Sequence, residues 1–136
     1  MSTQEAHIVT DSLWGDLPDV EEGPTPRSIL RQQANALTSQ TRGVLSGEVE
    51  TTVEDGHVVV KLLLVAPYLG NYEVEVVSVW HSATFFYPLT VTNLLQRPRR
   101  GIDCNNIEEF KVALAKILQS KVVHRAIAAL LAQSQT

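Results

Sequence analysis

The chain has 136 residues, of which 44% are hydrophobic and 19% charged, and its formal net charge is −4. This length fits one domain that needs neither a metal nor a disulfide to hold it together, and Cys104, the only cysteine, is a free thiol of the kind found in the cytoplasm. The acidic balance argues against a nucleic-acid partner, and no apolar run is long enough to span a membrane.

The first 24 residues differ from the rest of the chain in charge. They contain six acidic and no basic side chains, so we expect an acidic N-terminal tail (1–24) followed by a single α+β domain (25–136). Within the tail, Leu13, Trp14 and Leu17 are too apolar for a purely solvating segment. They either fold back onto the domain, which the large apolar area of tryptophan favours, or form a docking motif for a partner.

A helix is predicted directly after the tail. Thr25 can cap it, Pro26 occupies the first helical position, where its missing N–H does no harm, and Gly43 is a natural stop. One face of this helix is mostly apolar at helical spacing, with Ile29, Leu30, Gln33, Ala34 and Leu37.

Residues 44–92 change to the period-two pattern of strands. Asp55-Gly56 is the clearest turn signal and indicates a two-residue hairpin, whereas Ser82-Ala83 is weaker because neither residue favours positive φ. We therefore expect a four-stranded antiparallel meander with strands near 44–54, 57–66, 72–81 and 84–92.

The first hairpin fixes which side chains share a face. Glu54 faces His57 and Glu50 faces Lys61 across the two strands on the outer face, with the pair Thr52–Val59 between them. The alternate pairs, such as Val53–Val58, Thr51–Val60 and Val49–Leu62, point toward the helices. Extending the alternation along the later strands assigns the following residues to the core face: Tyr72, Val74, Val76, Ser78, Trp80, Phe85, Tyr87, Leu89 and Val91.

The opposite face of the sheet carries more apolar side chains than a solvated face usually does. Beside several glutamates it holds Val59, Leu63, Val77, Val79 and Phe86. Apolar patches rimmed by charge commonly mark protein contacts, so we interpret this face as an interface with a second copy of the chain (a homodimer) or with another protein, and we assign Trp14 to it as well. The alternative is that the tail covers the face within the molecule.

The remainder of the chain predicts a loop and two helices that pack on the same sheet face as the first helix. Asp103, Asn105 or Asn106 can cap the first of these helices, and Ser120 starts the second. Residues 97–100 contain the one basic cluster, which we interpret as a solvated loop or as a contact for an acidic surface.

Titratable groups meet at one corner of the expected sheet. The register places Glu54, His57 and His81 together on the outer face, where they could bind a divalent metal or exchange protons. Polar residues are also the ordinary choice beside a turn and at a strand end, so no metal site is assigned. Cys104 precedes a helix, a setting that lowers the pKa of a thiol, but the adjacent Asp103 opposes this effect.

No motif in the sequence specifies a reaction, so no catalytic residue and no cofactor is predicted. The pattern favours a non-catalytic protein-interaction module that uses the exposed sheet face. The alternative is a small-molecule-binding protein or an enzyme, with a pocket between the sheet and the helices near Tyr72, Trp80 and Tyr87, where polar aromatic side chains would line a cavity.

Overall fold

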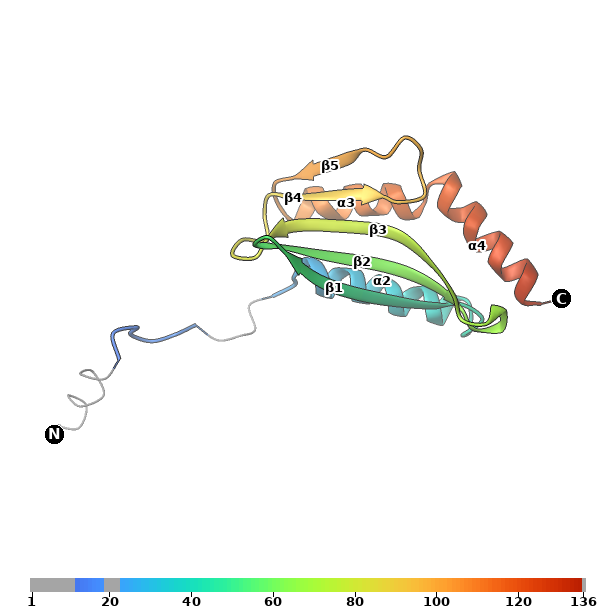
Figure 1. Ribbon diagram of the computed structural model, residues 1–136, viewed down its shortest axis with the longest axis horizontal. Helices are drawn as coiled ribbons and strands as arrows, with labels where there is room; N and C mark the ends of the chain where they lie inside the picture. Colours follow the sequence, from blue (N-terminus) through green and yellow to red (C-terminus); the bar gives the residue numbers. More distant parts are fainter. Residues whose placement is uncertain (1–11, 19–22, 136) are drawn as a thin grey trace.

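The computed structural model describes residues 12–18 and 23–135, which form three α-helices against one antiparallel sheet (Figure 1). Five strands pair in the order β1-β2-β3-β4-β5, each with its neighbour along the chain. The predicted fold class is confirmed, with five strands in place of four. The elements in chain order are α2 (Pro26–Gln40), β1 (Ser46–Glu54), β2 (His57–Ala66), the 3-10 helix η1 (Pro67–Leu69), β3 (Tyr72–Ser82), β4 (Leu89–Asn93), β5 (Gly101–Cys104), α3 (Ile107–Leu118) and α4 (Lys121–Ser134).

Each α-helix starts at a side chain that satisfies a free backbone N–H. At α2, Thr25 and Ser28 cap each other, with N–O distances of 3.0 and 2.8 Å. Asn106 accepts a hydrogen bond from the backbone of Glu109 at the start of α3, and Ser120 caps α4. The predicted caps Thr25 and Ser120 are confirmed, and Asn106 is the residue used among the three candidates for α3.

The helices cover one face of the sheet, with α2 over β1 and β2 and α3 over β4 and β5 (Figure 1). Contact between α2 and β1 is close at Gly47, where a Cβ atom would lie 2.5 Å from the backbone of Ala34. The Gly47 N–H also donates to Thr38 Oγ1 at 3.0 Å. A glycine at this position therefore lets the helix approach the edge strand. The centre of the core includes Leu30, Leu45, Val60, Val77, Val79, Val91 and Phe110.

The pairing of β1 with β2 matches the prediction throughout, with Glu54 opposite His57 and Glu50 opposite Lys61. On β3 the pairing shifts by one residue between Leu62 and Leu63, because Val76 has no counterpart on β2. Such a β-bulge exchanges the two faces for every residue beyond it.

Beyond the bulge, the predicted faces of β3 are wrong. Val77 and Val79 were expected on the outer face but are fully buried beneath the helices, at 0% exposure. Ser78 and Trp80 were expected in the core but face outward, and Trp80 is 46% exposed. The reason is that Val76 and Val77 both point toward the helices, which a regular alternation forbids.

The predicted two-residue turn at Ser82-Ala83 is also wrong. Residues 83–88 form a loop that ends at the cis Tyr87–Pro88 peptide, and β4 begins only at Leu89. Phe85 and Phe86 therefore lie in a loop and are exposed, although Phe85 was assigned to the core. Leu89 and Val91 do face the core as predicted.

Adjacent substitutions on β3 test the bulge. Val79→Asp should cost more than about 4 kcal/mol or prevent folding, since it places a carboxylate without a partner in the core. Ser78→Asp, one residue earlier on the outer face, should change the free energy of unfolding by about 0.5 kcal/mol or less. Urea denaturation followed by circular dichroism measures both. The opposite order of the two effects would show that β3 pairs without the bulge.

Candidate functional site

Exposed aromatic side chains gather at one end of the sheet, where the β1–β2 turn meets the β3–β4 loop. A hydrogen bond from Ala83 N to Gly56 O, 2.9 Å long, joins the two segments. We call this region the aromatic end; it consists of the half-buried His57 and the exposed Val53, Trp80, Phe85 and Phe86. His57 and Trp80 lie on the outer face, whereas Val53 shares the helix-side face with Val58 and His81, so the region wraps around the end of the sheet. Large apolar side chains left in water at one place are typical of a contact surface.

Two ring contacts give the aromatic end a defined shape. The rings of His57 and Trp80 stack on the outer face, with centroids 4.0 Å apart and planes 12° from parallel. His57 Nδ1 lies 3.1 Å from the carbonyl oxygen of Asp55, which holds its imidazole in the stack. Phe86 packs edge-on against His81, with centroids 5.6 Å apart. The exposed rings of Trp80 and Phe86 are therefore held in place by neighbouring groups.

The predicted meeting of Glu54, His57 and His81 does not occur. His57 faces outward beside Glu54, whereas His81 pairs with Val58 on the core side and is buried. The bulge causes this separation, because it turns His81 to the opposite face. Within the part of the chain that the structure describes, no group of three His, Cys, Asp or Glu side chains is arranged to hold a metal ion.

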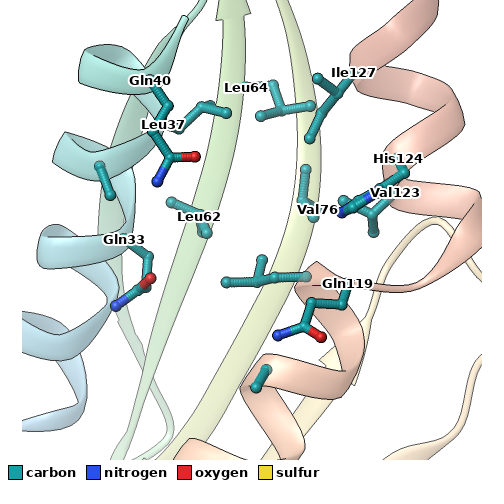
Figure 2. A pocket seen from close by; sticks show the side chains of 13 residues that line it. Gln33, Leu37, Gln40, Leu62, Leu64, Val76, Gln119, Val123, His124 and Ile127 are labelled. Carbon is teal, nitrogen blue, oxygen red and sulfur yellow. The ribbon is translucent and has the colours of Figure 1, made fainter.

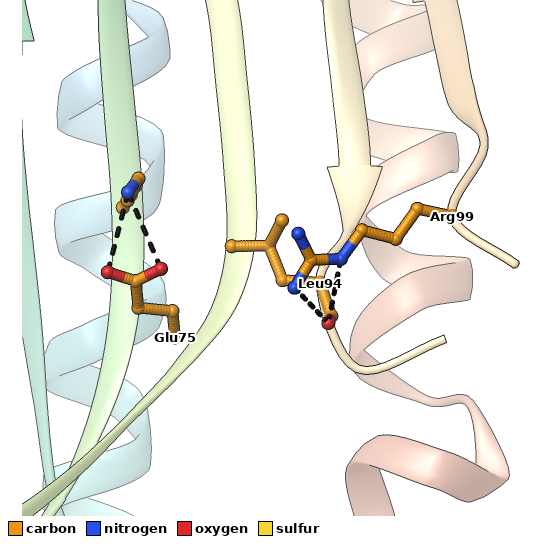
Figure 3. A network of polar contacts seen from close by, with 4 residues as sticks. Glu75, Leu94 and Arg99 are labelled. Atoms are coloured by element: carbon orange, nitrogen blue, oxygen red, sulfur yellow. Dashed lines mark hydrogen bonds and ion pairs between the residues drawn. The ribbon is translucent and has the colours of Figure 1, made fainter. Parts of the chain in front are cut away.

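The outer face is strongly acidic. The described strands carry six acidic side chains against one basic side chain, Lys61, and all six point to the outer face: Glu48, Glu50, Glu54, Glu73, Glu75 and Asp103. Lys61 pairs with Glu75 at 3.4 Å (Figure 3) and leaves Glu50, opposite it on β1, without that partner. The face therefore attracts cationic groups and repels anionic ones.

Apolar residues of the outer face are less open than predicted. Leu63, assigned to the interface, is buried between Glu48 and Glu75 of the adjacent strands. Val59 is half-buried beside Trp80. The centre of the face therefore offers little apolar surface, and the exposed apolar area lies at the aromatic end.

Trp14 does not pack on the domain. It is 78% exposed, and Leu13 and Leu17 are also exposed. The chain enters α2 at the same end of the molecule as the β1–β2 turn (Figure 1). Of the two alternatives for these apolar tail residues, the structure does not show the fold-back.

The predicted pocket near Tyr72, Trp80 and Tyr87 is not formed, because these residues lie apart. Tyr72 is exposed beside η1, Trp80 is on the outer face and Tyr87 is half-buried near Cys104. The cavity between the sheet and the helices that Figure 2 shows lies elsewhere, among α2, β2, β3, α3 and α4, and none of the three aromatic residues lines it.

Cys104 is a structural thiol. It is buried at 1% exposure, and burial together with Glu109 and Asp103 raises its pKa, so the reactive thiolate is disfavoured. Burial also raises the pKa of Tyr87, whose hydroxyl has no hydrogen-bond partner among the described residues. Both groups are therefore held in their neutral forms.

The basic cluster has a structural role in part. Arg97 donates to the carbonyl oxygen of Leu94 at 2.8 Å, and Arg99 donates to the same oxygen at 3.1 Å (Figure 3). Two guanidinium groups thus fix the loop between β4 and β5. Arg100 borders a shallow depression next to α3.

Comparison with known proteins gives no relative, since no family model, curated protein or solved structure matches the chain at a significant level. No described helix combines the length and the apolar character needed to cross a membrane.

The raised pKa values of Cys104 and Tyr87 predict a loss of stability at alkaline pH. Because the folded chain holds these protons more tightly than the unfolded chain, stability is complete below the ordinary pKa of a thiol, about 8.5, and falls above it. Each group contributes a slope of at most about 1.4 kcal/mol per pH unit. Urea midpoints between about pH 7.5 and 9.5, on either side of that ordinary pKa, measure this slope, which should be shallower in Cys104→Ala. An identical slope in that variant would contradict the role of the thiol.

Proposed function

We propose that the chain is a non-catalytic protein-interaction module that binds a basic, partly apolar segment of another protein through the aromatic end and the adjoining outer face. The observation that carries this proposal is the Trp80–His57 stack, with its exposed tryptophan, within an acidic sheet face. Tryptophan is enriched where binding energy concentrates in protein interfaces. Titratable side chains do border one depression beside β5 and α3, namely Asp103, Cys104, Glu108, Glu109 and Lys116. An enzyme is not favoured there, because the one thiol nucleophile among them, Cys104, is buried and its pKa is raised.

Charge indicates the kind of partner. Arginine and lysine are attracted both to the face of a tryptophan ring and to carboxylates. Trp80 on β3 and Asp103 on β5 lie in one cross-strand row, with Thr90 of β4 between them. A second copy of the chain is a poorer match, since face-to-face packing would oppose the glutamates of β1 and β3 with one another. A heterologous basic partner is therefore preferred over a homodimer.

The tail supplies a second contact in this proposal. Leu13, Trp14 and Leu17 have the spacing of three and four residues at which apolar anchors of a helix dock into a groove, and all three are exposed. The tail joins the domain at the end that carries the aromatic residues (Figure 1). One partner can therefore engage both. The reducing cytoplasm suits such a module, because its single thiol, Cys104, is unpaired.

Selection from a random peptide library on the immobilised full chain tests the proposal. We expect the selected peptides to be rich in Arg, Lys and apolar residues, and to bind at least tenfold more weakly to Trp80→Ala/Phe86→Ala. Tyr68→Ala is the matched control, because Tyr68 is an exposed aromatic residue in η1, at the opposite end of β2. Binding should also weaken as salt rises, since charge pairs at a surface are screened.

Two results would overturn the proposal. One is the selection of peptides without basic residues, and the other is equal loss of binding in Tyr68→Ala and the double variant. Sedimentation of the wild type separates self-association from partner binding, and we expect a monomer. A dimer that dissociates in Trp80→Ala/Phe86→Ala would assign the aromatic end to a homodimer interface instead.

A further inference from the structure

The helices leave a cavity of about 340 Å³ over the middle of the sheet (Figure 2). Leu62 and Leu64 of β2 and Val76 of β3 form its floor. Its walls come from α2 on one side and from the end of α3 and the start of α4 on the other. This volume lies at the lower end of the range of small-molecule sites, about 300–1,000 Å³.

Short side chains keep the cavity open. Ala36 of α2 and Ala115 of α3 both line it, so the two helices do not meet across the sheet at this level. An unfilled gap between apolar side chains forfeits dispersion contacts, so any molecule that fills it gains them. The cavity is on the helix side of the sheet, away from the outer face and the Trp80–His57 stack.

The polar groups at the cavity are uncharged amides and one imidazole. Gln33 and Gln40 extend from α2, and Gln119 projects into the gap from the end of α3, opposite them (Figure 2). His124 completes this set on α4. No side-chain hydrogen bond involves any of the four within the described part of the chain. Glutamine amides both donate and accept, so they can bind a carbonyl, an amide or a hydroxyl group.

We infer that this cavity is a binding site for a small, uncharged and largely apolar molecule that carries one such polar group. Among the residues that line the cavity none is Asp, Glu, Lys or Arg. The lining therefore offers a charged ligand no carboxylate, ammonium or guanidinium partner. The cavity is open to solvent where Gln40, Gln119 and His124 are exposed, so the preference for an uncharged ligand comes from its apolar floor, where a charge would lose hydration. Lys111 lines an adjoining depression between α2 and α3, which shares Gln33, Ala115 and Leu118 with the cavity. The site is independent of the protein-interaction surface proposed above.

Two dyes that differ in charge test the inference. N-phenyl-1-naphthylamine is uncharged, and 1-anilinonaphthalene-8-sulfonate has the same ring system with an added sulfonate. In fluorescence titrations of the full chain, we expect the uncharged dye to bind at least tenfold more tightly than the sulfonate.

Variants of α2 locate the dye. Ala36→Leu fills the cavity and should weaken binding of the uncharged dye at least tenfold. Asn35→Leu is the matched control, because it adds the same side chain at the exposed neighbouring position and should leave binding unchanged. Ala115→Val narrows the cavity from α3 and serves if Ala36→Leu does not fold. Trp80→Ala should bind the dye as the wild type does.

Three outcomes would overturn the inference. They are equal affinity for the two dyes, equal affinity of Asn35→Leu and the cavity-filling variant, and loss of binding in Trp80→Ala. The last outcome would place the dye at the aromatic end. If the selected peptides do not depend on Trp80, the dye results still stand, because the peptides report binding at the outer face and the dyes report binding in the cavity on the helix side.

Discussion

One extra residue in the central strand, Val76, determines what each face of the sheet displays. Glu73, Glu75, Val77 and Val79 share one face in a regular strand, so either two glutamates would be buried or two valines exposed. The bulge at Val76 resolves this conflict by turning the glutamates outward and the valines inward. The bulge also brings Trp80 onto the outer face with the glutamates, whereas regular alternation from Glu73 and Glu75 would place it on the other face. The surface that is both acidic and aromatic thus depends on this residue.

The bulge is stabilised from outside the β2–β3 pair. The carbonyl oxygen of Val76 accepts a hydrogen bond from the N–H of Leu94 at 2.8 Å, just past the end of β4. Two arginines bind the carbonyl oxygen of Leu94 in turn. A backbone group that a bulge removes from the ladder is costly to leave unsatisfied, so the β4–β5 loop is part of what fixes the faces of β3.

Charge separates between the two layers of the molecule. The described helices carry six basic side chains, Arg or Lys, and two acidic ones, Glu108 and Glu109, whereas the acids of the strands all point away from the helices. The two faces of the described domain therefore present electrostatic fields of opposite sign. The cavity between the layers is lined by no Asp, Glu, Lys or Arg side chain, which makes it chemically distinct from both surfaces.

Local signals in the sequence were sufficient for the β1–β2 hairpin, the caps Thr25 and Ser120 and the α+β class, because a turn type or a cap involves residues close together in the chain. The faces of β3 depended on Val76 and Leu94, which meet only in the folded sheet. β5 has four residues with no strand pattern and forms because β4 offers it an edge. The separation of His57 from His81 and the cavity beside Ala36 likewise follow from how strands and helices pack, since alternation along one strand carries no information about a register shift in its partner.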